Sequence, residues 1–193
     1  MTSLSRTERS RTQILDAADL AFREQGFSGV SMEEIARRAG LTRKTVYNLF
    51  PSKEEIALRL IARVEADDRA YRTRMAAGED VRALLEIILT DSAAWCLANP
   101  SLARLALAPA ERPRPAPPAD RPSFQGLICD VMALGQAQGV IRRDEDPGFL
   151  ALVLLGIYGQ AMLSALSAGV MGREEIRRLI RIVIEGIGAP AAP

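Results

Sequence analysis

Apolar residues recur along this chain at intervals of three and four positions, with polar residues between them. Such spacing places the apolar side chains on one face of a helix, and it continues almost from end to end. The pattern therefore predicts an all-α protein. The predicted helices cover residues 10–25, 42–50, 53–77, 80–99, 102–108, 123–138, 148–168 and 173–187, together with a short helix that begins after Ser31.

The most specific local signals lie in the segment SMEEIARRAGLTRKTVYNLFPSKEEI. Ser31, with a glutamate three residues later, has the pattern of a capping box, which begins a helix. Gly40 lies where a helix commonly ends, because glycine adopts a left-handed conformation at little cost. Thr42 is a favourable N-cap for the next helix, and Pro51 ends that helix. Two short helices joined by a tight turn form a helix-turn-helix, with the recognition helix at 42–50.

The exposed side of the recognition helix carries the kinds of side chain that bind DNA. Basic groups, hydroxyls and an amide hold phosphates and contact base edges, and no carboxylate interrupts them. The chain has two lysines, Lys44 and Lys53, and both lie in this region. The alternative is a solvated helical hairpin, but the caps, the turn glycine and the charge all agree with DNA binding. The predicted DNA-binding residues are Thr42, Arg43, Lys44, Thr45, Tyr47, Asn48 and Lys53.

The segment AFREQGFSGVSMEEIARRAGLTRKTVYNLFPSKEEI resembles the N-terminal domain of the TetR family of bacterial transcriptional regulators. The resemblance covers roughly residues 10–60, and the run VYNLFPSKE at 46–54 is its most specific part. Lys44 replaces a small residue and Leu49 replaces a histidine that many members have, and both changes bear on the operator sequence. The resemblance implies phosphate contacts by Thr45, Tyr47 and Lys53, and base contacts by Arg43, Lys44 and Asn48.

Composition argues against an enzyme. The chain has no histidine, and histidine is the commonest general base and metal ligand. No glycine-rich phosphate loop is present, and Cys96 and Cys129 match no metal or redox spacing, so we expect neither a cofactor nor a metal. We expect both cysteines to be buried in a reducing cytoplasm. Catalytic activity of the C-terminal half alone, on any substrate, would favour the alternative that the protein is an enzyme.

The N-terminus shows no export signal, and apolar segments such as 149–158 are too short to span a bilayer. We therefore expect a cytoplasmic protein that has no membrane partner. The net charge of the chain is only +1, so the overall charge does not by itself indicate that the protein binds nucleic acid.

The helix pattern predicts two domains and a tail. Residues 1–52 form the helix-turn-helix domain, 53–187 a larger helical domain for effector binding and dimerisation, and 188–193 a disordered tail. The charged helix 53–77 contains no glycine or proline before its end, so we expect it to join the domains as a continuous rod. Six prolines between 109 and 122 predict an exposed loop.

The last two helices predict a homodimer. Helix 148–168 is apolar almost all round, and helix 173–187 has a clean apolar stripe, which suits a subunit interface. The alternative is that both helices pack only into their own core. The family resemblance favours a four-helix bundle shared between two subunits. The predicted interface residues are Tyr158, Met162, Leu179, Ile180, Val183 and Ile184.

An effector site is predicted between helices 80–99 and 123–138. Asp91 lies four residues before Trp95, so a carboxylate and an aromatic ring share one helix face, which suits a small apolar or cationic aromatic ligand. The alternative, which the residues alone favour, is that Trp95 is part of the core and Asp91 is a solvated carboxylate with no binding role. The predicted lining residues are Ile88, Asp91, Trp95, Phe124, Ile128 and Met132. The functional prediction is a repressor released from a palindromic operator by this effector; the alternative is a regulator controlled by a protein partner or lacking an effector.

Overall fold

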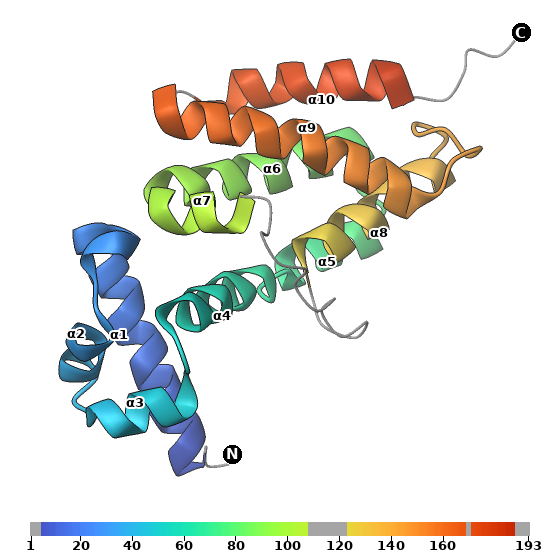
Figure 1. Cartoon of the computed structure of the whole chain (residues 1–193). Helices are drawn as coiled ribbons and strands as arrows, with labels where there is room; N and C mark the ends of the chain where they lie inside the picture. The colour runs from blue at the N-terminus through green and yellow to red at the C-terminus, as the bar shows by residue number, and fades with distance from the viewer. Residues whose placement is uncertain (1–4, 108–122, 169–170, 188–193) are drawn as a thin grey trace, which may run out of the picture. The chain divides into compact units, whose positions relative to one another are not determined.

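The structure is a computed structural model that describes residues 5–107, 123–168 and 171–187. Over these ranges the chain forms ten α-helices and no β-strand, which confirms the predicted all-α fold (Figure 1). The proline-rich segment 109–122 and the predicted tail 188–193 lie outside the described residues. The helices are α1 (Arg6–Gly29), α2 (Met32–Arg38), α3 (Arg43–Leu49), α4 (Lys53–Glu65), α5 (Arg69–Ala76), α6 (Val81–Ala98), α7 (Pro100–Leu107), α8 (Phe124–Ala137), α9 (Pro147–Ala168) and α10 (Arg173–Ile187).

The first compact unit consists of the chain up to Val64 together with Ala98–Ala106. It holds α1 to α4 and most of α7. The sequence places a domain boundary between residues 52 and 53, whereas this unit continues through α4. The reason is that one face of α4 is apolar and packs into the same core as the helix-turn-helix. The buried side chains of that core include Ile14, Ala18, Phe22, Ile35, Val46, Ile56 and Leu60.

Local signals set both ends of α1. The Ser5 hydroxyl accepts from the Glu8 N–H, and the Glu8 carboxylate accepts from the Ser5 N–H, so a complete capping box starts the helix earlier than residue 10. Near the other end, Gly26 has a φ of +71°, which breaks the helical path one residue after the end of the helix predicted at 10–25; α1 then continues to Gly29. A short turn then leads to α2.

The predicted continuous helix at 53–77 is wrong, because the chain leaves the helical path between α4 and α5. Asp68 precedes α5 with φ −98° and ψ 2°, and its side chain is largely buried. Its carboxylate accepts from Nε of Arg72 at 2.6 Å, and Nη1 of the same arginine donates to Asp130 of α8 at 3.0 Å. Aspartate favours turns over helix interiors, because its side chain competes for local hydrogen bonds. A rigid rod through residue 77 therefore does not exist.

The second compact unit contains α5, α6, α8, α9 and α10, with α9 beside both α8 and α10 (Figure 1). A hydrogen bond joins α9 to α6: the Tyr158 hydroxyl donates to the Leu89 carbonyl at 3.2 Å. Glu86 of α6 pairs with Arg177 of α10 at 2.9 Å. The side chains of the shared core include Leu84, Leu85, Ile88, Ile128, Val131, Met132, Leu150, Leu154 and Ile176.

Helix α9 is long and apolar enough to cross a membrane, by length and composition. The expectation that every apolar segment is too short was therefore wrong on length. Leu150, Leu154, Tyr158 and Met162 of this helix are buried within the protein, and core helices pass the same test.

Candidate nucleic-acid interface

The predicted helix-turn-helix is present as α2, a turn and α3. The Ser31 hydroxyl accepts from the Glu34 N–H at 3.1 Å at the start of α2. Gly40 has a φ of +65° in the turn, where glycine is favoured, and the Thr42 hydroxyl caps α3 by accepting from the Thr45 N–H at 3.2 Å. Side-chain caps therefore begin α2 and α3 at the positions that the sequence predicts.

Most of the predicted DNA-binding side chains lie exposed on α3. Arg43 and Lys44 are one turn before Tyr47 and Asn48, and all four are exposed, as is Thr42. Thr45 is half-buried, and its hydroxyl pairs with that of Thr42 at 2.8 Å. The structure thus brings six of the seven predicted residues to one short helix and its cap.

Two neighbouring side chains hold Arg43. Its Nη2 lies 2.5 Å from a carboxylate oxygen of Glu33 on α2, and its guanidinium carbon lies 5.6 Å from the centre of the Tyr47 ring. The pair with Glu33 is exposed, and exposed pairs contribute little stability. Separating Arg43 from Glu33 therefore costs little free energy.

Lys53, the seventh predicted residue, lies apart from α3. Its ammonium donates to the carbonyls of Phe27 and Val30 at 2.7 and 2.8 Å, and it lies 4.5 Å from the centre of the Phe27 ring. Sequence reasoning did not find these contacts, because the partners precede Lys53 by more than twenty residues.

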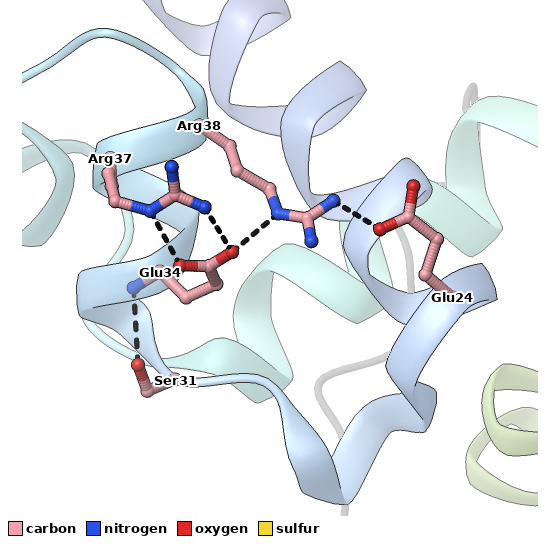
Figure 2. Close-up of polar contacts among 5 residues, drawn as sticks. All are labelled: Glu24, Ser31, Glu34, Arg37 and Arg38. Atoms are coloured by element: carbon pink, nitrogen blue, oxygen red, sulfur yellow. Dashed lines mark hydrogen bonds and ion pairs between the residues drawn. The ribbon is translucent and has the colours of Figure 1, made fainter.

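A four-residue ionic network anchors α2 to α1 and was not predicted (Figure 2). The Glu34 carboxylate accepts from Arg37 at 2.7 and 2.8 Å and from Arg38 at 2.7 Å, and Arg38 also donates to Glu24 of α1 at 2.7 Å. Hydrogen bonds from the two guanidinium groups lower the pKa of Glu34 to about 2. Only half of the predicted capping box forms, because this carboxylate binds arginines instead of the Ser31 N–H. The spacing of three and four residues between Glu34 and the two arginines is the sequence signal that could have predicted these ion pairs.

The predicted effector residues all lie in the second unit, but most of them are packed. Ile88, Ile128 and Met132 are buried, and Trp95 and Phe124 are half-buried. The Phe124 ring centre lies 6.5 Å from that of Tyr158. Side chains that already fill the core offer an effector little space unless the helices separate.

Asp91, the charged member of the predicted effector site, is exposed and already has a partner. Its carboxylate accepts from the Tyr71 hydroxyl of α5 at 2.8 Å. Burial of the tyrosine and the nearby carboxylate raise the pKa of Tyr71, so this hydroxyl stays protonated and keeps donating. A cationic ligand at Asp91 therefore competes with the neutral Tyr71 hydroxyl for this carboxylate.

An open pocket of about 390 Å³ lies elsewhere in the second unit, between α6 and α10. Charged arginine and glutamate side chains line it together with the apolar Ile180 and Ile184. Its lining holds three arginines and two glutamates, and one of these glutamates, Glu86, pairs with Arg177 at 2.9 Å. The lining residues are Arg82, Ala83, Glu86, Arg177, Ile180, Arg181, Ile184 and Glu185.

Five of the six predicted dimer residues are buried in their own chain, namely Tyr158, Met162, Ile180, Val183 and Ile184. Leu179 is half-buried. These buried side chains have almost no surface left to offer a partner. Other apolar side chains of the same two helices are exposed instead: Phe149, Leu152 and Ile157 on α9, and Ile182 on α10.

The remaining candidate chemistry is sparse. In the described part of the chain, no three histidine, cysteine, aspartate or glutamate side chains are grouped so that they could hold a metal ion. Cys96 is buried as predicted, and burial raises the pKa of its thiol to about 11, whereas Cys129 is only half-buried. Neither thiol is activated as a nucleophile.

Comparisons with known proteins agree with this geometry. The family "Bacterial regulatory proteins, tetR family" matches residues 14–60. The transcriptional repressor KstR2 of Rhodococcus jostii is 37% identical over 84 residues, which cover 42% of this chain and 41% of that protein. The transcriptional activator FasR of Mycolicibacterium smegmatis is 36% identical over 88 residues, covering 43% and 40%. The chain thus matches about two fifths of the length of these relatives.

The whole fold is also shared with solved structures. The TetR-family repressor FadR of Thermus thermophilus, solved in complex with lauroyl-CoA, superposes with a TM-score of 0.77. The two are 24% identical, and the superposition covers 95% of this chain and 97% of the other. This likeness concerns the fold, and it extends well beyond the helix-turn-helix.

Proposed function

The chain belongs to the TetR family of bacterial transcriptional regulators, and we propose that it is a repressor that binds double-stranded DNA at an inverted-repeat operator. We further propose that it acts in the cytoplasm as a homodimer. A two-fold dimer presents two recognition helices to half-sites about one helical turn (~34 Å), or a multiple of that, apart, which requires an operator with matching symmetry. The similarity to KstR2 supports repression, although FasR is an activator.

The observation that carries this proposal is the exposed face of α3. Arg43, Lys44, Tyr47 and Asn48 are all exposed there, and α3 itself contains no acidic residue. Arginine and asparagine make paired hydrogen bonds with guanine and adenine in the major groove, whereas lysine and tyrosine suit phosphates as well. We assign base contacts to Arg43 and Asn48, and phosphate contacts to Tyr47 and Thr45.

Selection of DNA fragments from a random pool tests both the function and the role of Arg43. The wild-type protein should select an inverted repeat. Arg43→Ala should select sites with relaxed preference at one or two base pairs in each half, with a loss of roughly 1–3 kcal/mol against the preferred site. Arg59→Ala serves as the control, because Arg59 is an exposed arginine of α4 that pairs with Glu55. An unchanged selected sequence for Arg43→Ala would remove Arg43 from base recognition.

We propose a small apolar or cationic aromatic effector that inserts between α6 and α8 near Trp95 and Asp91. Asp91 supports a cation, because its present partner is a neutral tyrosine. The burial of Ile88, Ile128 and Met132 favours the alternative, a regulator controlled by a protein partner or lacking an effector. The two differ in whether α6 and α8 separate to admit a molecule.

Fluorescence of Trp95, the chain's single tryptophan, distinguishes these alternatives. Benzyltrimethylammonium should change the emission of the wild-type protein at lower concentrations than it does for Asp91→Asn. A ligand that weakens DNA binding must itself bind more weakly to the DNA complex, by the same factor. Equal affinity with and without operator, or no response at all, would favour the alternative.

A further inference from the structure

Lys53 makes three contacts that a phosphate-binding lysine does not need. It opens α4, and its ammonium donates to the Phe27 and Val30 carbonyls at 2.7 and 2.8 Å. The same nitrogen lies 4.5 Å from the centre of the Phe27 ring, a distance at which a cation is attracted to an aromatic face. An ammonium has three donors, so two of them are occupied within the protein.

The segment that Lys53 binds determines where α2 begins. Gly26 breaks the helical path of α1 with its φ of +71°, and residues 27–30 then lead to Ser31, the N-cap of α2. This connection packs into the core at both ends. Val30 is buried, and the Phe27 ring lies 5.3 Å, centre to centre, from the buried Phe22. An ammonium that joins carbonyls 27 and 30 fixes the direction in which the chain enters α2.

We propose that Lys53 is a positioning residue, which orients the helix-turn-helix by binding the connection between α1 and α2, and that it does not bind a DNA phosphate. This assignment rests on the proposed DNA-binding function and replaces the phosphate role that the family resemblance implies. A second contact, at the far end of α4, also joins this helix to α1: Nη1 of Arg63 donates to the Asp16 carboxylate at 2.6 Å. Helices α1 to α4 are thereby held as one body.

The shape of the cation separates the two roles. Arginine binds phosphate at least as well as lysine, so Lys53→Arg should preserve a phosphate contact. A planar guanidinium is larger than an ammonium and does not fit the same position between two carbonyls and a ring. Lys53→Arg should therefore impair DNA binding about as much as Lys53→Met if Lys53 positions the turn.

The chain's two lysines allow the proposal to be tested on the wild-type protein. Labelling with ¹⁵N-lysine gives two side-chain ammonium signals, which Lys44→Arg and Lys53→Arg assign. We expect the Lys53 signal to be protected from exchange with water without DNA and to stay in place when a duplex is added. The Lys44 signal should be unprotected at first and should shift with DNA. An unprotected Lys53 signal, or one that moves with DNA as Lys44 does, overturns the proposal.

The salt dependence of binding provides the second measurement. Lys44 is an exposed positive charge on α3, close to the phosphates in the proposed complex, so Lys44→Met should reduce the slope of log affinity against log salt by about one counterion. Lys53→Met should instead lower affinity at every salt concentration without changing the slope. Amide exchange at Glu34 and Ile35, whose N–H groups donate to Ser31, should accelerate in both Lys53→Met and Lys53→Arg. Recovery of wild-type affinity by Lys53→Arg contradicts the proposal. Failure of the wild-type protein to bind any duplex counts against the proposed function instead, and the exchange measurements still decide the role of Lys53.

Discussion

If the proposed homodimer forms through α9, Leu152→Glu should yield a folded monomer that binds the proposed operator weakly. Leu152 is 57% exposed on α9, three residues after the exposed Phe149 and therefore on the same side of the helix, and α10, which packs against α9, exposes Ile182. A two-fold axis brings the same surface of both subunits together, so two introduced carboxylates would enter one apolar seam. An uncompensated buried charge costs several kcal/mol. Loss of the second half-site should weaken binding on the order of 10²–10⁴-fold.

Light scattering of the purified protein and titration with operator DNA measure these two effects. Leu20→Glu is a matched control, because Leu20 of α1 is 58% exposed and lies outside both α9 and α10. It should remain dimeric. Val183→Glu should instead unfold the chain, because Val183 is buried within its own subunit. A Leu152→Glu protein that remains dimeric would place the interface on another surface.

Gly135→Val should destabilise the second unit by about 1–3 kcal/mol or more, the usual cost of overpacking a core. A Cβ at Gly135 of α8 would lie 2.5 Å from Cγ1 of Ile141 and 3.0 Å from Cγ2 of Val81. Both neighbours are completely buried, so neither can move aside into solvent. Unfolding in urea, followed by circular dichroism, measures the loss.

A double-mutant cycle shows whether this contact is the cause. Ile141→Ala alone removes three carbons and should cost roughly 2–5 kcal/mol. In the double variant the valine at position 135 adds the carbons that position 141 has lost, so the combined cost should be smaller than the two separate costs added together, by about 0.5–3 kcal/mol. Purely additive losses would mean that the crowding at Gly135 arises elsewhere.

The helix-turn-helix could be predicted from the sequence because its determinants are local. The Ser31 and Thr42 caps each accept from an N–H three residues later, and Gly40 adopts the positive φ that ends α2. The contacts of Lys53 were missed for the opposite reason. Its partners at 27 and 30 are brought near only by the folding of three helices, and no spacing in the sequence records this.

The face of α9 that stays exposed on the subunit could not be predicted, because apolar residues occupy nearly every side of that helix. Leu150 and Leu154 are buried, whereas Leu152 between them is exposed, and composition does not distinguish the three. The break between α4 and α5 was missed because a run of charged residues is compatible with an exposed helix. Only the pairing of Arg72 with Asp68 and Asp130 shows how the chain is held at that point.

The discontinuity of the first unit limits how its DNA-binding part can be exchanged between proteins. A chimera cut at residue 52 would keep α1 to α3 but remove Ile56 and Leu60 from their core, together with Lys53 from the carbonyls that it joins. A cut after Val64 keeps these contacts, although the stretch Ala98–Ala106, which belongs to the same unit, would still come from the other parent. Specificity grafts should therefore transplant α3 side chains into the intact chain, where the supporting helices are already matched.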